Sequence, residues 1–407
     1  MRLSFSQGMK ADDARRLTAC IIGANDPTGN LAHEVVSAVE IQFLQRGWPV
    51  GEPLGALPQV QKDLGLGRPA WREAVIILEA RGLLDVRRGP GGGLFVAAPT
   101  AEDVVEAMQM YLIVCGADPG CIDEFRLLVW RMIVDAALTR GIDSPAASAL
   151  PADWDCVVAL AERIGNPAIT LSARIAQMLT GTESTEPSFA RPGRKSAMAL
   201  AAQMSREMMS RPGPEAEWET ADRLGYSVAV VRQARRILQD FGVVSCQRGR
   251  KGLHWSPAPG PAGVIRLLAP CLIATGMSAR DNAEAANFLA CNAPRLAAER
   301  AAARGGAIVK LLGTVANSLE LIDLIRTENF LLELACNPLL SIMTRSLGLA
   351  NLVSPGAQID VKGRVDIVAI NHRIMRAIEA GDAATAGALA RGKGEIQQAE
   401  AHYRLSA

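Results

Sequence analysis

The chain contains two copies of one segment, and this internal repeat constrains its fold more than any other feature. Residues 64–92 align with residues 224–252 at an offset of 160 without a gap, and ten of the 29 positions are identical. At the same offset the alignment continues more faintly, so that Glu124 falls on Glu284. A repeat of this kind indicates a duplicated structural unit. The chain must therefore fold as two similar units in tandem.

Each copy has the pattern of a helix-turn-helix. In the first copy, residues 31–47 place apolar side chains at helical spacing, which predicts a helix. A short second helix is expected from Pro58 to Leu64. The next helix begins near Pro69, which suits a first helical turn, and stops at Gly82, a residue typical of helix ends.

A two-stranded wing is expected after this helix. Leu83–Arg88 and Leu94–Ala97 have the composition of short strands. The segment GPGGG (89–93) between them is a glycine-rich turn that permits positive φ.

The segment GEPLGALPQVQKDLGLGRPAWREAV (51–75) resembles the winged helix-turn-helix head of the GntR family of transcription regulators. Two departures from the family pattern stand out. The family's arginine in the second helix is replaced by Pro58 and, in the second copy, by Trp218; the first arginine of the recognition helix, kept as Arg68, is Val228 in the second copy. The resemblance implies a sequence-specific DNA-binding regulator in which each head has lost part of the family's DNA-contact set.

The segments that follow the two wings are expected to be all-helical. The second resembles the FCD effector domain that follows many such heads, on residues 283–301, 331–340 and 371–390. The first keeps ERIGNPAI (162–169) but is about 55 residues shorter, as a truncated copy would be. The predicted fold is mainly α, with small β-wings and four parts: a first head (25–100), a truncated FCD-like segment (101–190), a second head (191–258) and an FCD-like effector or oligomerisation domain (263–407).

Arginines and one lysine on the recognition helices and wings are the candidates for contact with double-stranded DNA, because phosphate contacts supply affinity and base contacts supply specificity. These residues are Arg68, Arg72, Arg87, Arg88, Arg232, Arg235, Arg236, Arg248, Arg250 and Lys251. The alternative is that they form a solvated face or pair with Glu73, Glu79 and Asp240. Residues 191–256 carry 12 basic and 6 acidic residues, whereas the first head has no such excess, so the second head is expected to lead DNA binding.

The resemblance also implies a site for a small organic acid in the final domain. Family members hold a divalent metal there with one carboxylate and three histidines, but this chain has only four histidines in all. His372 matches one ligand position, Glu328 stands at a second, and the third falls near Gly394. Because one imidazole cannot hold a divalent ion, a metal-free effector site at His372, Arg373 and Glu328 is expected, with no cofactor.

Several other classes find no support in the sequence. Neither a signal peptide nor a membrane span is expected, and no CxxC pair is present. The eight cysteines are consistent with buried thiols, and a reducing cytoplasm is the expected location. No phosphate loop, paired-histidine motif or nucleophile elbow indicates an enzyme. The main alternative to a DNA-binding regulator is a co-regulator or protein-interaction module that kept the duplicated fold.

Two heads in one chain change the expected symmetry. Identical chains usually pair to read the two halves of a palindrome. Here the heads differ at the reading positions, as in Arg68 against Val228, so an operator with unlike halves about one helical turn, ~10 base pairs, apart is expected. Homodimerisation through the final domain is a further arrangement and would give four heads.

Overall fold

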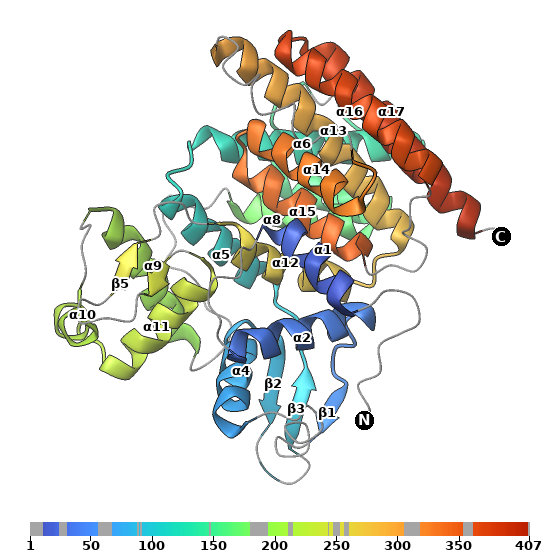
Figure 1. Cartoon of the computed structure of the whole chain (residues 1–407). Coiled ribbons are helices and arrows are strands. Elements are labelled where there is room, and N and C mark those ends of the chain that lie inside the picture. Colours follow the sequence, from blue (N-terminus) through green and yellow to red (C-terminus); the bar gives the residue numbers. More distant parts are fainter. Residues whose placement is uncertain are drawn as a thin grey trace. The chain divides into compact units, whose positions relative to one another are not determined.

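The computed structural model confirms a mainly helical protein with small antiparallel sheets (Figure 1). The structure describes residues 11–23, 31–55, 67–87, 89, 92–145, 148–179, 194–210, 215–242, 244–246, 253–255, 260–304, 318–352 and 361–405. Within these ranges, no helix is both long and apolar enough to cross a membrane.

The described residues form two compact units that do not follow chain order. The head unit comprises Gly23–Asp118 and Met178–Ala274, and the helical unit comprises Met9–Ile22, Pro119–Gln177 and Thr275–Ala407.

The first head is a helical layer against a three-stranded sheet. Its elements are α2 (Leu31–Gln45), β1 (Pro53–Gly55), α4 (Arg68–Ala80), β2 (Leu84–Arg87) and β3 (Gly93–Val96). The strand order is β1-β3-β2 and both pairings are antiparallel. The helix over 31–47 and both wing strands lie where the sequence predicts them, whereas β1 is an additional strand. The helix expected at Pro58–Leu64 lies outside the described residues.

Aromatic side chains form the centre of this head. Phe43 and Trp48 pack edge to face, with ring centroids 5.4 Å apart. The indole N–H of Trp48 donates to the carbonyl of Ala97 at 2.8 Å, and so ties the end of α2 to the end of the wing. Trp71 of α4 is buried in the same head.

The second head has helices followed by a two-stranded wing. Its elements are α9 (Arg194–Ser210), α10 (Glu217–Leu224), α11 (Val228–Asp240), β4 (Val244–Cys246) and β5 (Leu253–Trp255). The two strands pair antiparallel. Gly225 ends α10 in the left-handed conformation, with φ +70°, which a glycine adopts without steric cost.

Two further helices complete the head unit. α5 (Ala101–Val114) follows the first wing, and α12 (Ala262–Ala274) follows the second. α5 begins with a capping box in which Thr100 and Asp103 bond each other's backbone N–H groups. α5 packs against both α12 and α9. The apolar residues of α12 are therefore buried along most of its length.

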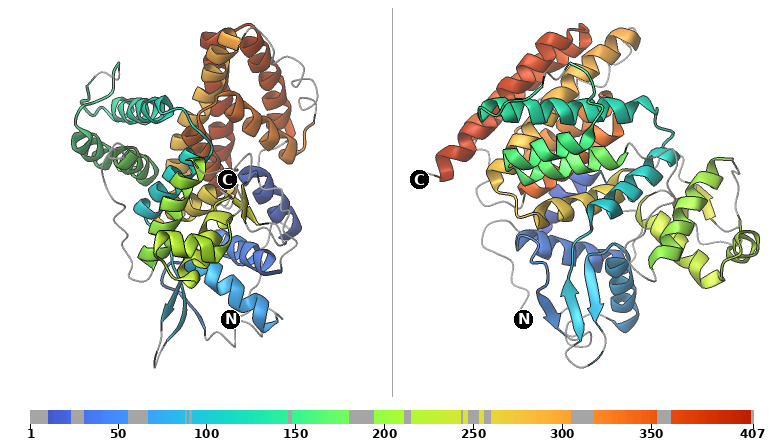
Figure 2. Two further views of the ribbon diagram at one scale, coloured as in Figure 1. Left: turned by 90° about the vertical axis from the view of Figure 1, so that its left-hand side faces the viewer. Right: turned by 180° about the vertical axis from the view of Figure 1, so that it is seen from behind.

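The helical unit is a bundle around one long helix. Its elements are α1 (Ala11–Ile22), α6 (Gly120–Thr139), α7 (Trp154–Ile164), α8 (Pro167–Met178), α13 (Ala279–Arg304), α14 (Leu321–Leu334), α15 (Pro338–Leu352), α16 (Val361–Glu379) and α17 (Ala383–Leu405). Helices α14 to α17 all pack on α13, and Figure 2 shows α17 running alongside it. Small residues such as Ala297, Ala301 and Ala386 pack with Ile374 and Ile378 in this core, which lets the helix backbones approach closely.

The first helix is held in the helical unit although it precedes the first head. Arg345 of α15 donates its Nε–H to the carbonyl of Ile21 at 2.6 Å. Asn329 of α14 donates to the carbonyl of Cys20 at 2.7 Å. These side chains satisfy carbonyls at the end of α1 that lack partners within the helix.

Candidate nucleic-acid interface

Helix α4 presents two arginines to solvent. Gly67 precedes it in an extended conformation, and Pro69 lies in its first turn, where an N–H would have no helical partner. The buried stripe of α4 consists of Trp71, Ala74, Val75, Ile77 and Leu78. Arg68 and Arg72 lie off this stripe and are exposed. The first head therefore holds both side chains on a face that can meet a ligand.

Helix α11 is the corresponding helix of the second head. Its N-cap Ser227 accepts a hydrogen bond from the N–H of Val230 at 3.4 Å. Val231, Ala234 and Leu238 are buried, whereas Arg232 and Arg236 are exposed. Arg232 stands at the repeat position of Arg72, so both heads expose an arginine at the same place on the helix.

Arg235 faces the interior and not the exposed side of α11. Its side chain is 8% exposed, and its guanidinium donates to the carbonyl of Glu215 and lies 3.9 Å from the carboxylate of Glu217. In the first copy the equivalent position is Val75, which is also buried. Arg235 thus connects α11 to the start of α10, and its burial is not compatible with the predicted contact to DNA.

The exposed Arg232 has a partner within its own head. Its Nε–H donates to Oε2 of Glu217 at 3.0 Å, and its side chain remains 55% exposed. Glu217 is the first residue of α10. The motif did not single out this glutamate, because the two residues are 15 positions apart and only the packing of α10 on α11 brings them together.

A second ionic cluster ties α10 to α9. Arg223 of α10 bonds Glu215 at 2.8 Å and also pairs with Glu207 of α9. The hydrogen bonds from Arg223 hold the pKa of Glu215 below its usual range. Glu207, Glu215 and Glu217 are therefore engaged with arginines, which reduces their repulsion of an approaching phosphate.

The wing of the first head carries an arginine that is braced on the wing itself. Arg87 donates to Asp85 at 3.0 Å, and its guanidinium lies 4.0 Å from the ring centre of Phe95. A Cβ at Gly92 would lie 2.4 Å from the carbonyl oxygen of Arg87, so this turn position admits only glycine. The other expected wing contacts lie outside the described residues: Arg88, Arg248, Arg250 and Lys251.

A buried carboxylate joins the first head to α12. Glu40 of α2 pairs with Arg81, the residue that ends α4, and with Arg266 of α12. The Glu40 and Arg81 side chains are 8% and 5% exposed. Because this cluster fixes the end of α4, it positions the helix that carries Arg68 and Arg72. Nothing in the sequence pattern singled it out.

The expected effector residues lie in the final bundle but do not converge as a metal site. Glu328 of α14 accepts from the ammonium of Lys393 of α17 at 2.5 Å, and Lys393 also donates to Asn371 of α16 at 3.2 Å. His372 is half-buried and Arg373 is exposed. Among the described residues, no three His, Cys, Asp or Glu side chains group as metal ligands. Lys393, which is not among the expected site residues, supplies a buried cation beside Glu328.

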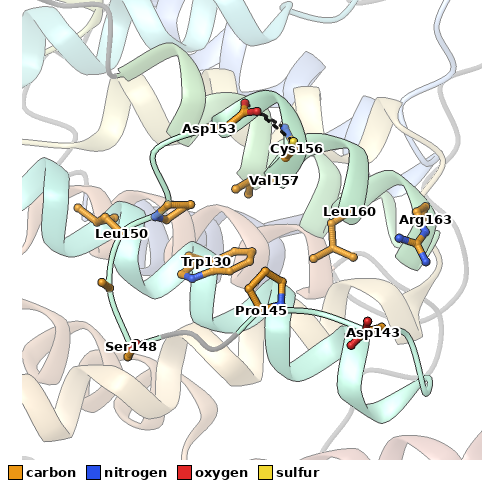
Figure 3. A pocket seen from close by; sticks show the side chains of 12 residues that line it. Trp130, Asp143, Pro145, Ser148, Leu150, Asp153, Cys156, Val157, Leu160 and Arg163 are labelled. Atoms are coloured by element: carbon orange, nitrogen blue, oxygen red, sulfur yellow. Dashed lines mark hydrogen bonds between the residues drawn. The ribbon is translucent and has the colours of Figure 1, made fainter.

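A hollow of about 500 Å³ lies elsewhere in the helical unit, between α6, α7 and the segment that joins them (Figure 3). Trp130, Val157 and Leu160 line it with apolar surface. Arg163 and Asp143 lie at one end in Figure 3, while Asp153 accepts a hydrogen bond from the thiol of Cys156 at 3.0 Å. This hollow lies between α6 and α7, and not in the final bundle where a pocket was expected.

Comparison with known proteins gives little further guidance. No protein-family model matches the chain, and no curated protein matches it. A solved structure of a Streptococcus agalactiae GntR matches 50% of this chain and 99% of its own, with 17% identity and a TM-score of 0.33. A TM-score this low does not establish a shared fold.

Proposed function

We propose that the protein is a non-enzymatic, sequence-specific DNA-binding regulator that uses two unlike heads in one chain. The observation that carries this proposal is the matched exposure of Arg72 on α4 and Arg232 on α11, at the same position of the repeat. In both heads the helix is backed by a buried apolar stripe and followed by a wing. Helix-turn-helix proteins place such a helix in the major groove, where arginine can reach guanine.

The second head supplies the larger basic excess, so the proposal gives it the larger share of the binding energy. Two heads in one chain also act at high effective concentration, so each can be weak alone. Because Arg68 has Val228 as its counterpart, the two heads prefer different half-sites, about one helical turn apart.

Selection of genomic fragments with the purified full chain, followed by footprinting, tests this function. Binding should weaken steeply as salt rises, because phosphate contacts release counterions. Footprints should cover two unlike half-sites. A short, perfect palindrome contacted by one head of each of two chains would contradict the two-head proposal.

A co-regulator that binds proteins and not DNA is the second candidate. The observation that favours it is the pairing of Arg232 with Glu217, which occupies the exposed arginine of the second head. Trp218, beside this pair, is 61% exposed and would suit a protein surface. This candidate would be favoured if the protein retained no DNA fragment at any salt concentration.

The regulator proposal includes a small-molecule effector bound by the helical unit, with an organic acid as the first class to test. The buried ammonium of Lys393, beside Glu328 and Asn371, supports a polar site in the final bundle. A thermal-shift screen of small acids tests this, with the Lys393→Met variant as the comparison. Acids that stabilise both proteins equally would place the site elsewhere, with the hollow at Trp130 the next location to examine.

A further inference from the structure

The two copies contact each other reciprocally within the helical unit. Arg140, at the end of α6 in the first copy, forms a bidentate pair with Glu284 of α13, with N–O distances of 2.7 and 2.8 Å. Arg300 of α13 pairs with Glu124 of α6 at 3.1 and 3.0 Å. At the offset of 160, Glu124 corresponds to Glu284 and Arg140 to Arg300. Each copy therefore gives its arginine to the glutamate of the other.

Two asparagines repeat the same reciprocity. Asn166 donates to Glu284 at 2.9 Å and to the carbonyl of Asp281 at 3.0 Å. Asn337 donates to Glu124 at 2.6 Å and to the carbonyl of Cys121 at 3.0 Å. The first asparagine precedes Pro167 of α8, and the second precedes Pro338 of α15.

The backbone around the two asparagines is also matched. Gly165 and Cys336, which precede them, both have left-handed conformations, with φ +75° and +46°. The carbonyl oxygen of each asparagine side chain accepts an N–H from the first turn of the next helix. A left-handed cysteine is uncommon, so the match shows that the geometry is kept even where the glycine is lost.

Near the centre of this arrangement, a residue of the first copy contacts the equivalent residue of the second copy. When Asn166 is placed on Asn337, Ser172 falls on Met343. Ser172 Oγ lies 3.8 Å from Met343 Sδ, and both side chains are fully buried. Contacts in which residue i meets j and j meets i, with one residue meeting its own equivalent, define a two-fold axis.

We propose that the helical unit is an intramolecular pseudo-dimer with two-fold symmetry. The first copy binds the surface of the second copy that a second chain would otherwise bind. The interface of α13 and α15 is then occupied by α6 and α8, so the protein is a monomer that needs no second chain to complete this surface. The inference concerns the helical unit alone and does not depend on DNA binding.

The truncation of the first copy fits this arrangement. In the second copy, α13 is covered by α17, and Cys291 and Arg295 lie against it. The equivalent residues of α6 are Arg131, half-buried, and Asp135, exposed. At these two positions the thiol of Cys291 is replaced by the charged Arg131, and Arg295 is replaced by the exposed Asp135. The first copy keeps its part of the two-fold interface while its outer face is suited to water.

Charge reversal in the full chain tests the proposal. Arg140→Glu/Arg300→Glu breaks both reciprocal pairs, and adding Glu124→Arg/Glu284→Arg restores opposite charges. Arg174→Glu is the matched control, because Arg174 pairs with Glu162 of its own copy at 2.8 Å on the surface. Sedimentation equilibrium measures the mass, and thermal unfolding measures the midpoint.

The native chain should sediment at 43.2 kDa over the accessible concentration range. The double reversal should lower the unfolding midpoint by about 5 °C, and the fourfold variant should recover at least half of that loss. The control should stay within about 1 °C. If the double reversal does not fold, Arg140→Gln/Arg300→Gln takes its place. This variant should also lower the unfolding midpoint by more than the control does, but by less than about 5 °C.

Two results would overturn the proposal. One is a native chain of twice the mass that becomes monomeric in the double reversal with an unchanged midpoint, because the pairs would then join separate chains. The other is a monomer whose midpoint does not respond to either double variant, because the reciprocal contacts would then not hold the copies together.

Discussion

Arg232 and Glu217 form an ion pair inside the second head, and this pair links α11 to α10. The N–O distances are 3.0 and 2.9 Å, and both side chains are partly open to solvent. A phosphate or base that approaches α11 must compete with this carboxylate for the guanidinium. The strength of that competition can be measured by replacing Arg232 and Glu217 in turn.

Replacing Arg232 by Ala should weaken binding to selected DNA fragments by about 1–3 kcal/mol if the side chain contacts a base. Fluorescence anisotropy at fixed salt measures the change. Arg174→Ala removes an exposed arginine from the helical unit and serves as the control. Equal affinities for the Arg232→Ala protein and the native chain would remove Arg232 from the interface.

Glu217→Gln should tighten DNA binding by about two- to fivefold, because it frees Arg232 from a partly exposed pair. Glu219→Gln removes the same charge from the same helix, but the carboxylate of Glu219 accepts from the N–H of Ala216 and not from Arg232. The difference between the two variants isolates the pair from general repulsion. A gain that is identical in both would show that only net charge matters.

Removing the carboxylate of Glu40 should destabilise the head unit by about 3–5 kcal/mol, because the buried guanidinium of Arg81 would lose its ion pair with this carboxylate. Chemical denaturation of the Glu40→Gln protein checks this. Glu52→Gln breaks the more exposed pair with Arg46 and should cost no more than about 1 kcal/mol. Similar losses in both variants would mean that burial does not govern the energetics here.

The pair between Arg140 and Glu284 should make the helical unit sensitive to acid. Hydrogen bonds from Arg140 lower the pKa of Glu284 below its ordinary value of 4.5. A lowered pKa in the folded state contributes stability that is present above pH 4.5 and is lost as the pH falls through the folded value. Arg140→Ala should flatten this part of the stability profile, measured by urea unfolding at a series of pH values. If the free energy of unfolding of the variant falls with pH as steeply as that of the native chain, other carboxylates cause the loss of stability in acid.

Chelation should leave the final bundle unchanged, because Lys393 already supplies the cation beside Glu328. We expect EDTA to shift the unfolding midpoint by less than about 1 °C, since no bound ion would be removed. Elemental analysis of protein purified without chelator provides the independent check. Stoichiometric zinc, nickel or manganese would show that His372 belongs to a metal site after all.

Local periodicity accounts for what could be predicted of the two heads. The spacing of apolar residues predicted α2 and α4, and the glycine-rich turn predicted the strands around it, because these features depend on neighbours a few positions away. The repeat also indicates that Arg235 is buried, because Arg235 occupies the position of the buried Val75 in the first copy. The net charge of residues 191–256 does not distinguish buried from exposed arginines, so it did not identify Arg235 as buried.

The sequence by itself determined the repeat, the helical class and the exposed positions of Arg68, Arg72, Arg232 and Arg236, but it misplaced Arg235, which is buried. Only the tertiary structure decided which charges meet: Arg232 with Glu217, Glu40 with Arg81, and Arg140 with Glu284. These pairs join residues from 15 to 144 positions apart. A charged side chain has no periodic signature that identifies its partner, because Coulomb attraction depends on distance in space and on exclusion of water, and both are fixed only when helices pack.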